Sequence, residues 1–112
     1  MKKLKSNQRM SQIVIHNDVI YLSGQVGDIK DDISAQTLSC LKKIQDLLEE
    51  AGSDQSKILS ATIWLKSMTD FEAMNAVWDD WFRDTLPPAR ACGESALAHP
   101  DLLVEITVIA AA

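Results

Sequence analysis

The sequence contains little glycine, proline or cysteine, and it has no long apolar run. Its 112 residues include only 4 Gly, 3 Pro and 2 Cys, while 46% are hydrophobic. This composition excludes a disordered or low-complexity chain. Cys40 and Cys92 lie far apart without CxxC or Cys/His spacing, which predicts a reduced, cytoplasmic protein with no structural metal. The best apolar run, 102–112, is about half of the ~20 residues that cross a bilayer and is interrupted by Glu105.

Basic side chains are also scarce. The chain has 11 Lys and Arg against 16 Asp and Glu, so its formal net charge is -5. This balance argues against nucleic acid and anionic membranes as partners, because both require a basic surface. The Lys-rich start at 1–5 is not followed by the apolar stretch of a signal peptide. The length indicates a single domain spanning residues 1–112.

Apolar periodicity predicts five strands and two helices. Alternating or β-branched runs predict strands, and spacings of three and four predict helices. Asn17 and Asp18 suit the tight turn of a hairpin, Asp31 or Asp32 can cap the first helix, Gly52 can end it, and Thr69 or Asp70 can cap the second. The expected elements are strands at 12–16, 19–23, 57–66, 89–96 and 103–110, with helices at 33–51 and 70–84. The order ββαβαββ predicts a two-layer α+β fold.

The strand segments at 57–66 and 103–110 carry apolar residues at both alternating positions. In the first of them we expect Leu59, Ala61, Ile63 and Leu65 to share one face. Two helices can cover only one face of such a sheet, so the other face requires a different cover. We therefore predict a homo-oligomer, in which further copies of the chain cover the second face.

Two charged residues interrupt these apolar strands. Arg90 opens the predicted strand 89–96, and Glu105 alternates with Thr107 and Ile109 in the last strand. If those two strands are neighbours, both charges lie near one pocket. One interpretation is a structural ion pair at a subunit interface. The other is a functional site, in which the planar guanidinium of Arg90 binds a small carboxylate and Glu105 acts as a general base on a water.

Other candidates carry weaker signals. Cys92 should share the strand face of Arg90. A nucleophilic cysteine needs a nearby base, however, and the only histidines, His16 and His99, fall in turns where surface roles are favoured. Asn75 borders the apolar stripe of the second helix, where a solvated amide is the simple interpretation. Ser23 and Gly24 lie at a strand end, where their backbone N–H groups could approach a ligand. The three tryptophans, Trp64, Trp78 and Trp81, are expected in the core.

An ordered set of short motifs resembles the reactive intermediate deaminase family, also called the Rid or YjgF family. The resemblance covers about residues 12–110, and its most specific part is PAR-A-C at 88–92 followed by VEI at 104–106. The other matching segments are LSGQ at 22–25, AQT at 35–37, AGS at 51–53, ATIWL at 61–65, and DF at 70–71 with MN at 74–75. It implies a chorismate-mutase-like fold and a homotrimer whose sheets form a central barrel, with pockets at the subunit interfaces.

The resemblance also implies an activity and roles for individual residues. The expected reaction is hydrolysis of enamine or imine intermediates, such as 2-aminoacrylate released by pyridoxal-phosphate enzymes, to 2-oxo acids and ammonia without a cofactor. Arg90 would bind the substrate carboxylate and Glu105 would activate water. The remaining pocket residues would be Ser23, Gly24, Asn75 and Cys92.

The chain departs from the family pattern near its N-terminus. The usual Gly-Pro-Tyr-Ser-Gln stretch is absent, and Met10 stands where deaminases typically have an aromatic pocket residue. The alternative function is a binding or regulatory module that uses the same pocket for a small carboxylate or 2-oxo acid without turnover. The family also includes proteins described as ribonucleases, translation inhibitors and chaperones, and the acidic composition argues against a nucleic-acid role here.

Overall fold

Three antiparallel strands open the chain in the computed structural model, which describes all 112 residues. They are β1 (Lys2–Ser6), β2 (Ser11–His16) and β3 (Val19–Leu22), followed by the short β4 (Gln25–Val26). Positive φ angles of 50° at Asn17 and 62° at Asp18 confirm the predicted hairpin turn. The strand β1 was not predicted, because its lysines hide any apolar alternation. Such charges are tolerated on β1 because it is an edge strand.

The two predicted helices are both present. The first is α1 (Ile33–Glu50), where Asp32 Oδ1 accepts a hydrogen bond from the Ala35 amide at 2.8 Å and Gly52 follows with φ 83°. The second is α2 (Phe71–Trp81), which ends three residues earlier than predicted. It ends early because Thr85 N–H turns back to the Phe82 carbonyl. Short 3-10 turns precede β5 and α2: η1 (Gln55–Lys57) and η2 (Met68–Asp70).

The capping of α2 differs from the prediction. Neither expected residue caps it through its side chain. Instead Ser67 caps η2, since its hydroxyl accepts a hydrogen bond from the Thr69 amide at 3.3 Å, and Asp70 makes no side-chain cap bond. The chain therefore enters α2 through a preformed turn.

The remaining strands are β5 (Ile58–Leu65), β6 (Ala89–Glu94) and β7 (Val104–Ala111). The sheet order is β1-β2-β3-β7-β5-β6, and β4 also pairs with β7. The expectation that the last two strands are neighbours is wrong, because β5 lies between them. The helix α2 carries the chain from β5 back to a parallel β6, as a βαβ crossover requires, and β7 then pairs antiparallel with β5.

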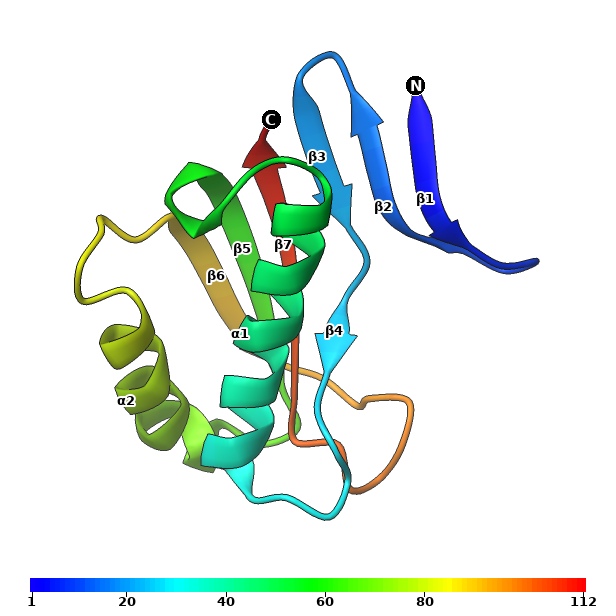
Figure 1. The fold of residues 1–112 in the computed structure, drawn as a ribbon. Helices are drawn as coiled ribbons and strands as arrows, with labels where there is room; N and C mark the ends of the chain where they lie inside the picture. Colours follow the sequence, from blue (N-terminus) through cyan, green and yellow to red (C-terminus); the bar gives the residue numbers. More distant parts are fainter.

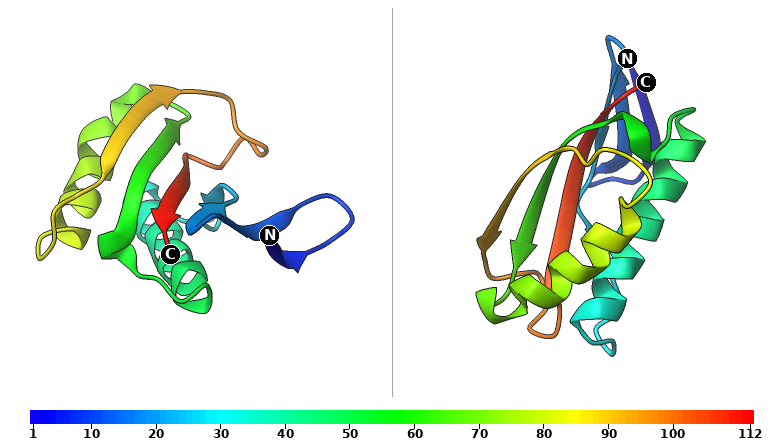
Figure 2. Two further views of the ribbon diagram at one scale, coloured as in Figure 1. Left: turned by 90° about the horizontal axis from the view of Figure 1, so that it is seen from above. Right: turned by 90° about the vertical axis from the view of Figure 1, so that its left-hand side faces the viewer.

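Both helices pack on one face of the sheet (Figures 1 and 2). We call this face the closed face and the opposite one the open face. The closed face is lined by fully buried apolar side chains from both layers, among them Ile13, Ile20, Leu41, Ile44, Ile63, Leu65, Met74, Val104 and Ile106. No helix or strand covers the open face in the right-hand view of Figure 2. The predicted two-layer α+β fold with one uncovered sheet face is therefore confirmed.

Several large side chains lie exposed on the open face. Tyr21 is 45% exposed and Trp64 is 39% exposed, so the prediction that Trp64 belongs to the core is wrong. A register shift between Ile58 and Ser60 also changes the expected alternation of β5. Because of this bulge Ile58 turns inward, and Leu59 is 52% exposed instead of sharing the face of Ala61.

Candidate functional site

Arg90 lies on the edge strand β6, and its side chain packs against α2. Its Nη2 donates a hydrogen bond to Asn75 Oδ1 at 2.6 Å, and its Nη1 lies 3.9 Å from the sulfur of Met74. The guanidinium carbon is 5.1 Å from the ring centre of Trp78 and 6.0 Å from that of Phe71. Cation–π attraction and the amide contact therefore hold the guanidinium in one orientation. We call these five side chains the arginine cluster.

The positive charge of Arg90 has no carboxylate partner in the chain. The ion pairs of the structure join Lys5 to Glu50 and Arg83 to Asp80 and Asp84. A guanidinium has five N–H donors, and only two of its nitrogens have a partner here. The cluster therefore presents an oriented cation with free donors, which suits a planar anion such as a carboxylate.

Cys92 lies two residues further along β6 on the same face as Arg90, as predicted. Arg90 pairs in register with Ala61 and Cys92 with Ile63, and both of these partners are buried under the helices. Burial raises the pKa of the Cys92 thiol, and the nearby Arg90 charge lowers it only in part. The thiol is therefore protonated near neutral pH and is a poor nucleophile.

Glu105 lies on the opposite, open face of the sheet. It pairs in register with Trp64 on β5 and with Val26 on β4, while its neighbours Val104 and Ile106 point into the core. Its half-buried carboxylate forms no hydrogen bond or ion pair within the chain. The carboxylate extends over Gly24, where an added Cβ would lie only 2.6 Å from Oε2. The absence of a side chain at Gly24 therefore makes room for Glu105.

Ser23 links this region to the turn between β1 and β2. Its hydroxyl donates to the Ser11 carbonyl at 2.7 Å, and its amide donates to the Gln12 carbonyl at 3.0 Å. Met10 directly precedes Ser11 and lines a hollow beside that turn. These residues lie on neighbouring segments. We call the set the glutamate cluster; it comprises Met10, Ser23, Gly24 and Glu105.

A single chain does not bring all the predicted site residues together. The arginine cluster, with Cys92 beside it, lies on the closed side at the β6 edge, and the glutamate cluster lies on the open face. The expectation of one pocket rested on β6 and β7 being neighbours, which they are not. An intramolecular ion pair between Arg90 and Glu105 is therefore excluded.

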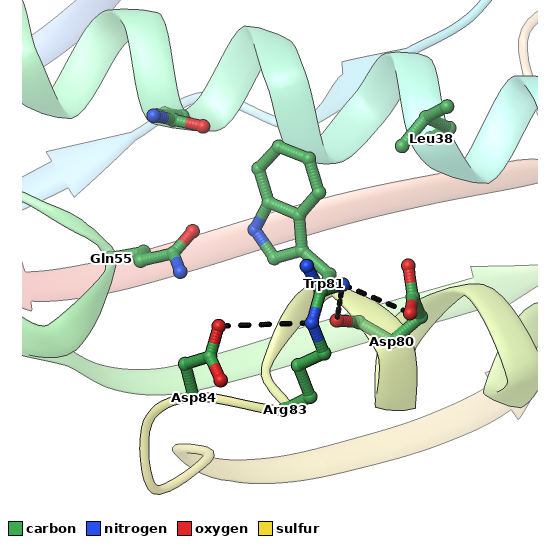
Figure 3. A pocket seen from close by; sticks show the side chains of 7 residues that line it. Leu38, Gln55, Asp80, Trp81, Arg83 and Asp84 are labelled. Carbon is green, nitrogen blue, oxygen red and sulfur yellow. Dashed lines mark hydrogen bonds and ion pairs between the residues drawn. The ribbon is translucent and has the colours of Figure 1, made fainter.

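Another hollow, of about 390 Å³, lies between α1 and the end of α2 and contains none of the predicted residues. Figure 3 shows Trp81 over this hollow and Arg83 paired with Asp80 and Asp84, at 3.0 and 3.7 Å. Its only cation is therefore already paired with carboxylates. No helix of the structure is long and apolar enough to span a membrane, and no group of three or more His, Cys, Asp or Glu side chains is placed to hold a metal ion.

The contacts of Arg90 with two aromatic rings and a thioether were not predicted from the sequence. Met74 and Trp78 are buried and Phe71 is half-buried, so their helical spacing is that of ordinary core residues. Pattern alone gives no sign that one edge of this apolar stripe meets a cation. The only available signal was the position of Asn75 at the border of the stripe.

The comparisons with known proteins cover almost the whole chain. A family model described as endoribonuclease L-PSP matches residues 1–112. A RutC family protein of Haemophilus influenzae is 38% identical over 112 residues, covering 98% of this chain and 97% of its own. The RutC family protein YoaB of Escherichia coli is 38% identical over 109 residues, covering 97% of this chain and 96% of its own.

Solved structures agree with these sequences. A member of the YjgF protein family from Neisseria meningitidis superimposes with a TM-score of 0.94 at 39% identity, covering 98% of this chain and 92% of its own. A Rid family protein from Yersinia pestis superimposes with a TM-score of 0.87 at 33% identity, covering 96% and 90%. The sheet order, the helices on one face and the matched sequence therefore lead to one assignment: this chain belongs to the Rid/YjgF family, whose model is described as endoribonuclease L-PSP.

Proposed function

We propose that the protein hydrolyses 2-imino acids and their enamine forms, such as 2-aminoacrylate, to 2-oxo acids and ammonia. The observation that carries this proposal is the Arg90 guanidinium, oriented by Asn75 and two aromatic rings and left without a carboxylate partner. Because no carboxylate of the chain competes for this oriented guanidinium, its donors are available to an anionic ligand. Family membership supports the same reaction class.

The complete site forms between two copies of the chain in this proposal. Arg90 and Glu105 lie on opposite faces of one sheet, so a pocket containing both needs Arg90 of one copy and Glu105 of the next. The open face, with Tyr21 and Trp64 exposed, supplies the surface for association. A cyclic trimer gives three equivalent pockets of this kind.

In this proposal the arginine cluster binds the substrate and the glutamate cluster activates water. Arg90 binds the substrate carboxylate through two parallel hydrogen bonds, which orients the electrophilic C=N carbon. Glu105 accepts a proton from a water whose oxygen bonds to that carbon, and the former π electrons move to nitrogen, which is protonated. The resulting carbinolamine loses its C–N bond as the hydroxyl proton leaves. Imine plus water thus gives 2-oxo acid plus ammonia, with no change in oxidation state.

The test generates an imino acid in situ with an amino-acid oxidase and traps it with semicarbazide. The active protein lowers the yield of trapped product. We expect Arg90→Ala to abolish this effect, while Arg83→Ala, which removes an arginine already paired with carboxylates, retains it. No effect from the wild-type protein, together with saturable 2-oxo acid binding, would identify a non-catalytic binding module instead.

A mixing experiment tests the shared pocket. We expect Glu105→Gln to bind 2-oxo acid but to turn over slowly, and Arg90→Ala to lose both properties. When the two inactive variants are unfolded together and refolded, random cyclic assembly restores both native residues in about a quarter of the pockets. Recovered activity near that fraction supports a site shared between copies, and no recovery contradicts it.

A further inference from the structure

The edge strand β1 and the turn that follows it, residues 6–11, carry a charge pattern that the proposed reaction does not use. Residues 1–17 contain four basic side chains and no acidic one, although the whole chain has a net charge of -5. The four are Lys2, Lys3, Lys5 and Arg9. We call residues 6–11 the tip, which projects outward past β1 at the edge of the sheet that lies far from the helices (Figure 1).

Two of these cations line a hollow and lack a partner. The hollow has a volume of about 470 Å³, and Lys3, Arg9, Met10 and Val14 are among its lining residues. Lys5 pairs with Glu50 at 3.4 Å, but neither Lys3 nor Arg9 forms an ion pair. The hollow is therefore a cationic concavity in an acidic protein.

Hydrogen bonds fix the backbone that carries Arg9. Asn7 Oδ1 accepts from the Arg9 amide at 2.7 Å and from the Met10 amide at 3.0 Å, and the Asn7 amide donates to the Met10 carbonyl at 2.9 Å. Asparagine side chains commonly close turns in this way. Less conformational entropy is then lost when an anion binds Arg9.

The hollow opens on the same side of the sheet as Glu105. Lys3 pairs in register with Val14, Val14 with Tyr21, and Tyr21 with Ile109, which alternates with Glu105 on the open face of β7. The Ser23 hydroxyl bonds to the Ser11 carbonyl, which joins the tip to the segment beneath Glu105. The cationic hollow thus lies on the open face, and Met10 belongs both to its lining and to the glutamate cluster.

We propose that Arg9, assisted by Lys3, binds a second carboxylate on the side chain of the substrate. This inference rests on the proposed function and narrows its substrate class to the imines of dicarboxylic 2-oxo acids. Arg90 is the cation for the carboxylate next to the imine carbon, so a second anionic group requires a second cation. Lys3 and Arg9 are exposed and have no carboxylate partner in the chain, so both are free to bind such a group.

The test compares 2-iminoglutarate with 2-iminobutyrate, each generated by an amino-acid oxidase and trapped with semicarbazide. Since a charge-assisted hydrogen bond is worth about tenfold or more in affinity, we expect kcat/KM to favour 2-iminoglutarate by at least about tenfold. Arg9→Gln should reduce that ratio about tenfold. Lys2→Gln is the matched control, because Lys2 neighbours Lys3 on β1 but does not line the hollow, and it should keep the wild-type ratio.

The outcomes separate this inference from the proposed function. Hydrolysis of both substrates at equal rates, or an unchanged ratio in Arg9→Gln, overturns the second carboxylate site and leaves the deaminase proposal standing. If neither imine is hydrolysed, the deaminase proposal fails. The anion site is then tested by measuring the binding of 2-oxoglutarate and 2-oxobutyrate by calorimetry. Tighter binding of 2-oxoglutarate that Arg9→Gln abolishes supports the site, and equal binding of the two overturns it.

Discussion

The two faces of the sheet are made by the same strands but satisfy different requirements. On β7, Val104, Ile106 and Val108 point to the closed face and are at most 2% exposed, while Glu105 and Thr107 between them are only half-buried. Polar groups buried beneath the helices are paired, and the unpaired Arg90 lies at the exposed β6 edge of this side. Gln36, for example, is fully buried and bonds to the carbonyls of Asp31 and Asp101 and to the Leu103 amide.

The open face instead retains unsatisfied groups. The carboxylate of Glu105 has no partner, and the aromatic rings of Tyr21 and Trp64 meet solvent. A face that is complete within one chain contributes to folding, whereas a face with unpaired charge and exposed aromatic surface is available for association and ligand binding. Substitutions on the two faces should therefore have different effects.

The largest effect should come from the closed face. Ile106 is fully buried, so Ile106→Ala removes packed methylene groups and leaves a cavity. We expect the free energy of unfolding to fall by about 3 kcal/mol, measured by urea denaturation. A loss below about 1 kcal/mol would mean that the closed face does not form the core.

On the open face, Ile109→Lys should disrupt association. A lysine on an apolar surface buried between copies would lack a counter-charge, so we expect the dissociation constant of the oligomer to rise at least about a hundredfold. Light scattering should then give the monomer mass of 12.4 kDa. Leu38→Lys, on the helix layer near Asp80, is the control that should keep the wild-type mass. A wild-type monomer would contradict the proposed assembly.

The buried thiol on the closed side predicts a loss of stability in alkali. Burial raises the pKa of Cys40 to about 12. Between the ordinary thiol pKa and this value the unfolded chain loses a proton that the folded chain keeps, so the free energy of unfolding falls as the pH rises. At pH 10 the loss should reach about 2 kcal/mol. Cys40→Ala should flatten this slope between pH 8 and 10, and an equal slope in both proteins would refute the assignment.

Asn75 is a positioning residue for Arg90. Two variants distinguish the loss of its hydrogen bond from the addition of a negative charge beside the guanidinium. Asn75→Asp keeps an acceptor beside Nη2 but neutralises the guanidinium. We expect the KM for an imino acid to rise about tenfold, because the new carboxylate competes with the substrate. Asn75→Ala should raise KM less, with kcat nearly retained in both. Equal KM values in the two variants would indicate a purely structural role.

The smallest effect is expected at Gly24. A Cβ there would lie 2.6 Å from Glu105 Oε2, so Gly24→Ala must displace the carboxylate. We expect kcat to fall about fivefold with little change in KM, since less than 1 Å of misplacement of a catalytic base costs roughly this much. Gly93→Ala is the control, because its Cβ would meet only the ring edge of Trp64 at 3.2 Å. A wild-type kcat in Gly24→Ala would remove Glu105 from the mechanism.

Local sequence patterns were sufficient to locate most of the secondary structure and the unusual residues. Alternation and helical spacing located α1, α2 and five of the strands, the Asn17-Asp18 turn marked the hairpin, and two charges within apolar strands marked Arg90 and Glu105. It also implied an uncovered sheet face, because two helices cannot cover both sides. These features depend on neighbours a few residues away, which is the range that periodicity reports.

The identity of neighbouring strands, and with it the location of the two charges, became known from the three-dimensional structure alone. Strand pairing depends on contacts between distant segments, so the position of β5 between β6 and β7 was not readable from the order of the chain. That position separates the two strands, and the registers of β5 with β6 and β7 put Arg90 and Glu105 on opposite faces. The edge pairing of β1, the space above Gly24 and the orientation of Arg90 by α2 likewise arise from close approach in three dimensions.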